Sequence, residues 1–305
     1  MKKNKFIFLA KKAGEGLGLA NRIWQYSYFL AYTREHNIFL INPTFDEYVK
    51  FFNGTRDKYR FLGFDVSKYN DDYLFKLILF LRKSAKWGQR HSKIFRNNIL
   101  IKSVKKPNPV DMDQEAWNIE VEKNKFIFIE GWRIRCNVLF NKHKKYIKAF
   151  FQPISLHKKN VSNLLYPIKS NFDLVIGFHI RRADYGAYYP QYYFSFEQYS
   201  EFMNRISQYF KEKNIAFLLC SGEKIEKKYF SEYNCFDATG HFVEDMYALS
   251  KCDYIFGVSS TYSLWASFIG NVPISIIDSN DFKVDENNFF VCNGLELQEE
   301  MASKQ

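Results

Sequence analysis

The sequence predicts an α/β protein with two domains, each containing a parallel sheet covered by helices. The chain has 305 residues, of which 47% are apolar, enough for two hydrophobic cores. Its first apolar run is followed by a Gly-rich turn and then by a helical pattern. In the second half, short apolar runs alternate regularly with helical patterns, which favours parallel strands joined by helices.

In the first half the pattern is clear at both ends and weak in the middle. The predicted elements are strands over 5–10, 38–41 and 126–129, helices over 20–36, 74–84 and 137–151, and a polar loop over 105–113. Residues 153–171 lack periodicity and form the predicted link between the domains. We therefore expect a first domain over 1–160 and a second over 161–305.

The second half gives a more regular pattern. The predicted strands cover 174–180, 215–220, 254–258 and 274–277, and the predicted helices cover 195–213, 223–232, 244–251 and 261–269. Strands and helices at this spacing indicate a doubly covered parallel sheet, in which ligands bind where the strands end.

The net charge of +11 comes from one segment. Residues 73–110 carry ten Lys or Arg and no acidic residue, which leaves 34 basic residues to face 33 acidic ones elsewhere. A solvated basic helix explains this segment, and contact with anionic lipid headgroups is the alternative. No nucleic-acid motif accompanies it, so no nucleic acid is expected as a partner.

The five cysteines form no CxxC pair, which predicts buried, reduced thiols and a cytoplasmic protein. The apolar N-terminal run is too short for a signal peptide, and no transmembrane segment is visible. With the basic segment, this composition also allows peripheral attachment to the inner face of the membrane.

Polar residues follow the strand predicted over 174–180. His179, Arg181, Arg182 and Asp184 lie where this strand ends and a loop begins. A pair of arginines there suits a phosphate, because guanidinium groups make planar, bidentate contacts with its oxygens. A salt-bridge cluster that ties the loop to the sheet is the alternative.

Three other segments follow predicted strands. Ser259, Ser260 and Thr261 lie between a strand and a helix, where they can cap the helix and leave N–H groups for a phosphate. A Gly-rich turn from Gly14 to Gly18 precedes a helix and could let a ligand approach backbone N–H groups, but a tight structural turn is the commoner explanation. Trp132 and Arg133 suit a sugar ring, but a packed Trp is the commoner explanation.

No metal site is expected. The six histidines are dispersed, and Asp111 and Asp113 lie in a Pro-bearing polar loop rather than at a strand end, so their spacing is interpreted as coincidence.

Taken together and in order, four segments resemble the α-1,2-fucosyltransferases of glycosyltransferase family 11, within the broader His-x-Arg-Arg fucosyltransferase group. Residues 18–26 resemble the family's Gly-Leu-Gly-Asn-Gln start, and 131–133 resemble its Gly-Tyr-Trp/Phe-Gln segment. Residues 179–185 resemble His-x-Arg-Arg-Gly-Asp-Tyr, and 258–265 resemble Asn-Ser-Ser-Phe-Ser-Trp-Trp. The departures are Ala20 and Ala183 for Gly, Arg22 and Arg133 for Gln, Val258 for Asn and Leu264 for Trp.

The resemblance implies the GT-B fold, with two Rossmann-like domains facing a central cleft. It implies metal-independent, inverting transfer of L-fucose from GDP-β-L-fucose to a hydroxyl, such as O2 of a terminal β-galactose. The acceptor would be an oligosaccharide or a lipid-linked glycan, such as a lipopolysaccharide O-antigen. No cofactor is expected besides the donor substrate.

The resemblance also implies roles for residues. Arg181 would stabilise the leaving phosphate, with Arg182 sharing that role or holding the loop, and Asp184 is the nearest candidate for the base. His179, Asp245, Ser259, Ser260 and Thr261 would bind the donor, with Asp245 accepting from guanine. Gly18, Asn21, Arg22, Trp132 and Arg133 would line the acceptor side of the cleft.

Two other functions stay open. One is transfer of another GDP-6-deoxy sugar, or formation of another fucosyl linkage. The other is nucleotide or glycan binding without catalysis, which the two Gly-to-Ala departures favour.

Overall fold

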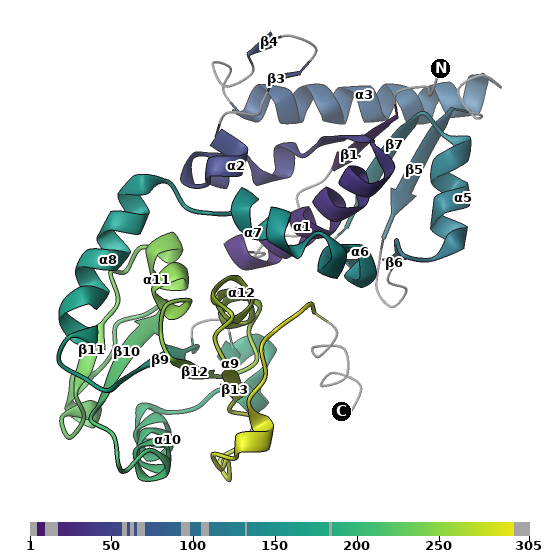
Figure 1. The fold of residues 1–305 in the computed structure, drawn as a ribbon. Coiled ribbons are helices and arrows are strands. Elements are labelled where there is room, and N and C mark those ends of the chain that lie inside the picture. Colours follow the sequence, from purple (N-terminus) through teal and green to yellow (C-terminus); the bar gives the residue numbers. More distant parts are fainter. Residues whose placement is uncertain are drawn as a thin grey trace. The chain divides into compact units, whose positions relative to one another are not determined.

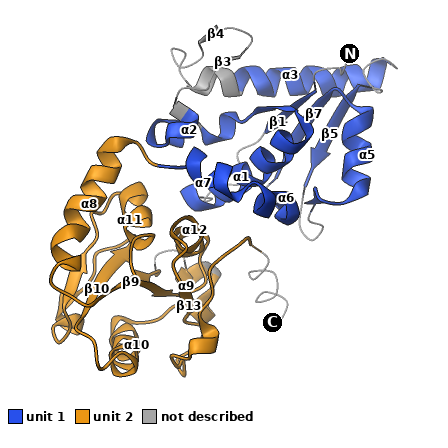
Figure 2. Cartoon of the chain, viewed as in Figure 1, with its two compact units in different colours: residues 1–152 blue, residues 153–305 orange. Residues whose placement is uncertain are grey.

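A computed structural model describes residues 5–9, 18–56, 60–61, 64–65, 71–92, 98–104, 110–131, 133–182 and 185–295. The chain divides into two compact units, residues 1–152 and 153–305 (Figure 2). The boundary predicted at residue 160 is wrong by several residues, because it falls inside helix α8 (Ser155–Lys169), which belongs entirely to the second unit.

The sheet of unit 1 is parallel throughout, in the order β2-β1-β7-β5. Its strands are β1 (Phe6–Leu9), β2 (Phe39–Ile41), β5 (Ile99–Ser103) and β7 (Phe126–Glu130). Short pairs also form between β3 (Arg60–Phe61) and β4 (Phe64–Asp65) and between β6 (Val110–Asp111) and β8 (Ile134–Arg135). Strand β6 lies in part of the predicted polar loop, whose residues 105–109 are outside the described residues.

Helices cover both faces of this sheet (Figure 1). They are α1 (Leu19–His36), α2 (Asn53–Arg56), α3 (Asp71–His91), α5 (Glu115–Lys123), α6 (Asn137–Lys142) and α7 (Lys144–Phe150), with the 3-10 helix η1 (Pro43–Phe51). Helix α1 buries thirteen of its eighteen residues, including Trp24, Tyr28 and Phe29. A helix that is apolar on nearly every side belongs in the centre of a domain.

The sheet of unit 2 is also parallel, in the order β11-β10-β9-β12-β13. Its strands are β9 (Leu174–Ile180), β10 (Ile215–Ser221), β11 (Cys235–Asp237), β12 (Tyr254–Gly257) and β13 (Ile274–Ile276). The helices of this unit are α8, α9 (Tyr185–Tyr188), α10 (Phe196–Tyr209), α11 (Phe242–Leu249) and α12 (Thr261–Gly270). Three 3-10 helices complete it, η3 (Pro190–Tyr192), η4 (Lys227–Phe230) and η5 (Glu286–Asn288).

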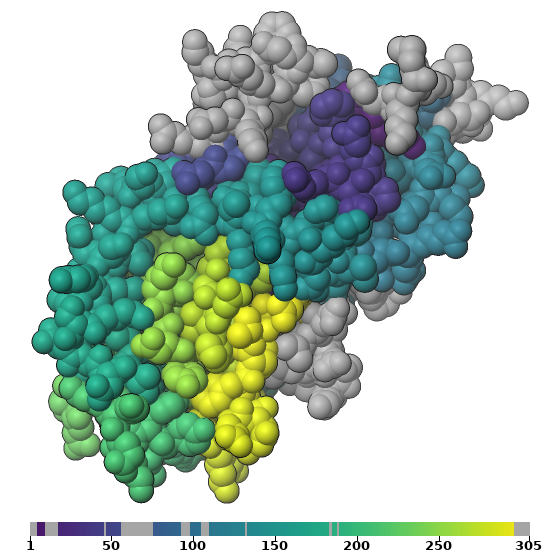
Figure 3. Space-filling model, viewed as in Figure 1, coloured from purple at the N-terminus to yellow at the C-terminus, as the bar shows by residue number. Residues whose placement is uncertain are grey.

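A large core lies on one face of the unit 2 sheet. Aromatic and aliphatic side chains of β9, β10, β12 and α10 are fully buried against each other, including Phe178, Tyr199 and Phe202. The segment after β13 adds Phe282 to this core, and the space-filling view shows this yellow segment along the surface of the unit (Figure 3). Together, the two parallel sheets with their helices confirm the predicted α/β class.

Three predicted elements were wrong. The predicted link over 153–171 is mostly helix α8, whose buried positions include His157, Val161 and Leu165. The period was missed because a histidine occupies one core position and Pro167 lies inside the helix. The predicted helix over 137–151 is two helices that meet at His143, where ψ is 12°.

The predicted helix over 223–232 is also wrong. The structure forms only η4 there and then the short strand β11. Most side chains of this segment are exposed, and Phe230 alone is buried, so a longer helix would have had little apolar surface to bury.

The five cysteines are free thiols, four of them buried, as predicted. In the part of the chain that the structure describes, no helix is both long enough and apolar enough to span a bilayer.

Candidate functional site

The candidate site lies where the sheet of unit 2 changes its direction of winding. Strands β10 and β11 lie on one side of β9, in chain order, and the next two strands, β12 and β13, lie on its other side. In open parallel sheets the crevice at such a reversal, beyond the carboxyl ends of the strands, is the usual ligand site. The segment with the two arginines follows β9, and Ser259 to Thr261 follow β12, so the structure brings these two predicted segments together.

His179 is the last but one residue of β9 and is only 4% exposed. Burial, and then the positive charge of Arg181, lower the pKa of its imidazole to about 3, so the ring is neutral at physiological pH. Its ring lies 5.2 Å from that of Tyr262, and its Nδ1 has no hydrogen-bond partner among the described residues. A buried ring nitrogen of this kind is available to a ligand, because an unpaired buried polar atom is costly.

Arg181 follows β9 directly and lies at the centre of the site. Its guanidinium carbon lies 5.4 Å from the ring centre of Tyr185, whose hydroxyl donates to the carbonyl oxygen of Ser259 at 2.6 Å. The backbone N–H of Arg181 donates to the Tyr199 hydroxyl at 3.3 Å. Tyr185 therefore ties the loop after β9 to the loop after β12, and Tyr199 fixes the backbone that carries Arg181.

Arg182 is held by neighbours within the same unit. It donates to the Tyr193 hydroxyl at 2.7 Å, forms an ion pair with Glu223 at 3.4 Å, and lies 4.2 Å from the ring centre of Phe196. Burial lowers the pKa of this guanidinium, but the Tyr193 hydrogen bond and the Glu223 charge outweigh it and leave the pKa raised. Of the two roles predicted for Arg182, its contacts favour holding the loop.

Ser260 is the N-cap of α12, and its side chain accepts from the backbone N–H of Tyr262 at 3.3 Å. The capping predicted for this segment is thereby confirmed. The first helical turn begins at Thr261, at the crevice end of β12, and the cap takes up the N–H group of Tyr262. The positive end of the helix dipole at this turn suits an anion.

Tyr262 connects the β9 side of the site to helix α11. Its ring contacts His179, and its hydroxyl donates to the carbonyl oxygen of Phe242 at 2.7 Å. Burial first, and then the charges of Cys220 and Asp245, raise the pKa of this phenol, so it stays protonated and can donate.

Asp245, one turn into α11, is 5% exposed. Its Oδ1 accepts from the Thr239 hydroxyl at 2.9 Å and from the backbone N–H of Gly240 at 3.1 Å. Burial raises the pKa of this carboxyl, and the two hydrogen bonds oppose that rise. Asp245 thus shapes the loop before α11, at the same end of the sheet as the other predicted donor residues.

Two predicted site residues, Asp184 and Trp132, lie outside the described residues. Conversely, sequence reasoning gave no role to Tyr185, Tyr199 or Tyr262, which position Arg181 and His179. The hydrogen bond of Tyr199 to Arg181 spans 18 positions and that of Tyr185 to Ser259 spans 74, and Tyr262 contacts His179 from another strand-to-helix segment, so no local pattern could have indicated these contacts.

The predicted acceptor residues belong to unit 1. Arg22 donates to the Thr44 carbonyl oxygen at 3.2 Å and pairs with Glu47 at 3.4 Å, so it fastens α1 to η1. Asn21 is in the first turn of α1, and Arg133 is half-buried between β7 and β8. Gly18 precedes α1 with an ordinary φ of −69° and open space where a Cβ would lie, so its backbone requires no glycine.

Gly131 is the glycine that this part of the fold requires. Its φ is +100°, and an added Cβ would lie 2.2 Å from the carbonyl oxygen of Val104. Its own carbonyl oxygen accepts from the side chain of Gln25 in α1 at 2.5 Å, so α1 fixes the loop in which Trp132 and Arg133 were predicted to bind a sugar.

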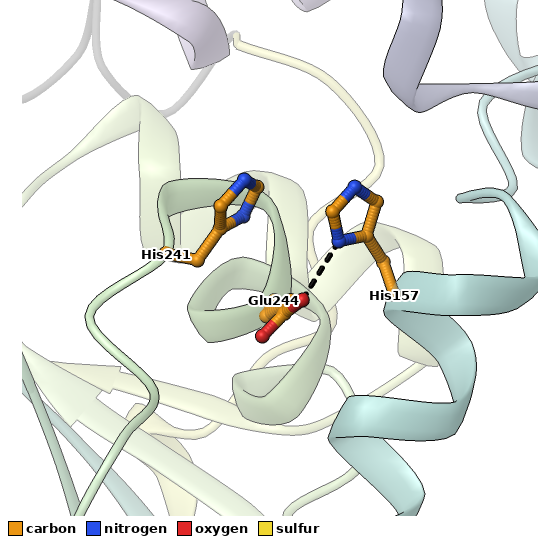
Figure 4. A group of neighbouring side chains, drawn as sticks. All are labelled: His157, His241 and Glu244. Carbon is orange, nitrogen blue, oxygen red and sulfur yellow. Dashed lines mark hydrogen bonds and ion pairs between the residues drawn. The ribbon is translucent and has the colours of Figure 1, made fainter.

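His157, His241 and Glu244 form a cluster that sequence spacing missed (Figure 4). Their candidate ligand atoms lie within 4.8 Å of one another. However, the two rings stack at 4.6 Å with planes 24° apart, and the Nδ1 of His241 already accepts from the backbone N–H of Val243 at 3.3 Å. Glu244 accepts instead from His157 at 2.7 Å and from Asn160 at 2.6 Å, which joins α8 to α11.

Asp111 and Asp113 have structural roles. The Asp111 carboxylate accepts from the backbone N–H of Asp113 at 3.0 Å. The Asp113 carboxylate accepts from the backbone N–H groups of Val138 at 2.8 Å and Leu139 at 3.3 Å, so it caps helix α6 from a distance. These hydrogen bonds join the loop before α5 to the start of α6.

The fold is similar to those of several solved structures. A mutant of FUT1 from Arabidopsis thaliana in complex with GDP shares 13% identity over 94% of this chain and 73% of that one, with a TM-score of 0.58. The α-1,6-fucosyltransferase NodZ co-crystallised with GDP shares 13% identity over 91% of this chain and 96% of that one, with a TM-score of 0.51. A NodZ structure from Bradyrhizobium is also similar. The apo form of POFUT1 shares 10% over 89% and 96%, with a TM-score of 0.51.

No family model matches the sequence, and a search of curated proteins finds no match. At this level of identity the similarity shows the GT-B type of α/β fold, as predicted, and the activity must be argued from the site.

Proposed function

We propose that the chain is a fucosyltransferase that moves L-fucose from GDP-β-L-fucose to a glycan hydroxyl, with inversion and without a metal ion. The observation that carries the proposal is that Arg181 and the N-terminus of α12 follow two paired strands, β9 and β12, at the reversal of the unit 2 sheet. The similar folds of FUT1 and NodZ, both solved with GDP, support a GDP-sugar as the ligand.

The site offers two kinds of positive charge to a diphosphate. Arg181 supplies a full charge, which Tyr185 and Tyr199 hold in place through its ring contact and backbone hydrogen bond. The first turn of α12 supplies N–H groups and the helix dipole, with Ser259 and Thr261 beside them for phosphate or ribose oxygens. Fixed groups of this kind stabilise a leaving group without reorganising during the reaction.

The remaining donor contacts follow from the same geometry. The unpartnered Nδ1 of buried, neutral His179 is a second feature that suits a ligand at this crevice. Asp245 would accept from guanine N1–H and N2–H, and Tyr262 would separate the guanine side from the phosphate side.

In the proposed step, an acceptor hydroxyl oxygen attacks C1 of fucose as the bond between C1 and the β-phosphate oxygen breaks. GDP leaves with the bonding electron pair, and Arg181 stabilises the negative charge that develops on the β-phosphate. Attack from the opposite face turns the β-linked donor into an α-fucoside. The hydroxyl proton passes to a base, for which Asp184 is our candidate.

For the acceptor we propose a terminal β-galactose, fucosylated at O2, of an oligosaccharide or lipid-linked surface glycan made in the cytoplasm. Asn21, Arg22, Trp132 and Arg133 of unit 1 are its proposed contacts. This part of the proposal rests on the resemblance of residues 18–26 and 131–133 to family 11.

The test is GDP release from GDP-fucose, with EDTA present, across a panel of β-galactoside acceptors. Acceptor-stimulated release that EDTA leaves unchanged is the expected result, and the productive acceptor identifies the linkage after product analysis. Parallel reactions with GDP-mannose and GDP-rhamnose separate fucose transfer from transfer of a related sugar.

Two outcomes would contradict the proposal. GDP binding without release for any donor or acceptor would favour a non-catalytic binding protein. The absence of GDP binding would overturn the assignment of the β9–β12 crevice as a nucleotide site.

A further inference from the structure

Helix α3 packs on the unit 1 sheet by one face only. Ile78 and Ala85 are buried against Phe8 of β1, Ile99 of β5 and Phe128 of β7. On the same side, Arg82 pairs with Glu130 at 2.6 Å, and the Gln89 side chain donates to the Ile99 carbonyl oxygen at 2.6 Å. These contacts fix how the helix is rotated about its axis, and therefore which residues face outward.

The outward face carries two large aromatic side chains. Phe80 is 64% exposed and Trp87 is 67% exposed. They are seven residues apart, so they lie on one side of the helix, two turns from each other and opposite Ile78 and Ala85. Paired aromatic exposure on one helix face, away from the core, is typical of a surface that is covered by a partner.

Basic side chains lie along the flank of the same face. Lys83, Lys86 and Arg90 are exposed, and they have no acidic partner among the residues the structure describes. Helical spacing places Lys83 next to Phe80 and Arg90 next to Trp87. Since residues 73–110 contain no Asp or Glu, nothing on the helix after Tyr73 offsets this charge.

We propose that this aromatic-basic face of α3 (Phe80, Lys83, Lys86, Trp87 and Arg90) docks on an anionic lipid bilayer. The aromatic rings enter the boundary between headgroups and acyl chains, while the basic groups pair with lipid phosphates. The combination favours a bilayer over a nucleic acid, because the aromatic side chains lie opposite the core as on an interfacial helix. None of these residues belongs to the unit 2 site, so the proposal stands apart from the proposed function.

The experiment measures binding of the full chain to sedimented vesicles of phosphatidylcholine alone and of phosphatidylcholine with 30% phosphatidylglycerol. We expect binding to the anionic vesicles that weakens as salt rises from low to physiological concentration, and little binding to the neutral vesicles.

Two sets of variants separate the charge from the aromatic contribution. Changing Lys83, Lys86 and Arg90 to Gln is expected to lower the partition coefficient on the order of a hundredfold. Phe80→Ser with Trp87→Ser is expected to lower it on the order of tenfold or more. The controls remove equal numbers of exposed groups from unit 2: Lys211, Lys213 and Lys224 to Gln, and Leu156→Ser with Tyr166→Ser.

Trp87 also gives a direct signal. Insertion should shift its fluorescence to shorter wavelength on anionic vesicles, and Trp87→Phe should abolish most of that shift while keeping vesicle binding. Trp24, Trp117 and Trp265 are buried and should respond little.

Three results would overturn the proposal. The first is equal binding to neutral and anionic vesicles, and the second is unchanged vesicle binding of both α3 variants. The third is a protein that does not bind vesicles but binds duplex DNA or associates with itself, and loses that binding in the α3 variants. Because no turnover is measured, failure here leaves the proposed transferase activity untouched, and failure of the activity leaves this test valid.

Discussion

At the scale of single residues, the two arginines after β9 are neighbours in sequence but not in role. Arg182 has a hydroxyl, a carboxylate and an aromatic ring around it, all from unit 2. The contacts of Arg181 include the hydrogen bond of its backbone N–H to Tyr199 and the ring of Tyr185, at the crevice end of β9. The sequence predicted both arginines as candidates but could not distinguish their roles. The difference depends on the contacts of Arg182 with Tyr193 and Glu223, which come from other segments of the chain.

His179 predicts a pH dependence of stability. Its folded-state pKa, about 3, lies below the ordinary value of 6.5, so between these values the unfolded state binds a proton that the folded state does not. The free energy of unfolding should therefore fall as pH falls through this window, by at most about 1.4 kcal/mol per pH unit from this group.

Denaturant unfolding of the unliganded protein at several pH values between 7.5 and 5 measures this, with His179→Asn for comparison. The stability advantage of the wild type over the variant should shrink toward low pH. Two curves that stay parallel would show that His179 does not bury a neutral ring.

Asp113 gives a second prediction for a single residue. Replacing it with Ala removes the acceptor for the Val138 and Leu139 N–H groups and should lower the free energy of unfolding by about 1 kcal/mol. The exposed Asp281→Ala is the control, with a change expected within about 0.5 kcal/mol. Denaturant unfolding measures both variants, and an Asp113→Ala protein as stable as the wild type would contradict the capping role.

At the scale of elements, the close approach of β9 and β12 beside the candidate site depends on a glycine. Gly257 pairs with His179 across the ladder, and a Cβ at Gly257 would lie 2.7 Å from the His179 carbonyl oxygen. Backbone atoms cannot move aside as a flexible side chain can, so this position requires glycine.

Gly257→Ala should therefore destabilise the protein by about 1–3 kcal/mol and weaken GDP binding, because it pushes β12 away from β9. Gly222→Ala is the matched control, since nothing lies within 4 Å of a Cβ there after β10. Thermal unfolding and GDP titration of the two variants measure the effects, and equal behaviour would contradict the packing argument.

The elements also show what the sequence could predict. Strand β9 was predicted with its bounds, because seven residues without charge lie between Asp173 and Arg181. Helix α8 was missed because His157 takes a core position through its bond to Glu244, a partner 87 residues away. Likewise, the site segments were predicted from polar residues at strand ends, but the tyrosines that join them depend on tertiary packing.

At the scale of the whole molecule, the chain comprises two units of almost equal length, each built on its own parallel sheet. The proposed donor residues all belong to unit 2, and the proposed acceptor residues and the basic helix α3 belong to unit 1. This division accounts for the uneven charge of the sequence, because the segment 73–110, with ten basic residues and no acidic one, lies entirely in unit 1.

The division also predicts which substrate a change will affect. Variants of unit 1 residues such as Asn21 and Arg133 should raise the acceptor KM several-fold and leave the Kd for GDP unchanged. Arg22→Ala should in addition lower thermal stability, because it loses its contacts with Thr44 and Glu47. Steady-state kinetics and GDP titration test this, and a weakened Kd for GDP in the Asn21 or Arg133 variants would contradict the assignment.

The most direct test of the central claim compares GDP-fucose turnover by Arg181→Ala and Arg182→Ala with that of the wild type. We expect Arg181→Ala to lower kcat by about 10²–10³-fold while the protein stays folded, because it removes the charge that stabilises the leaving phosphate. Arg182→Ala should mainly lower the melting temperature. Full turnover by Arg181→Ala would contradict the account.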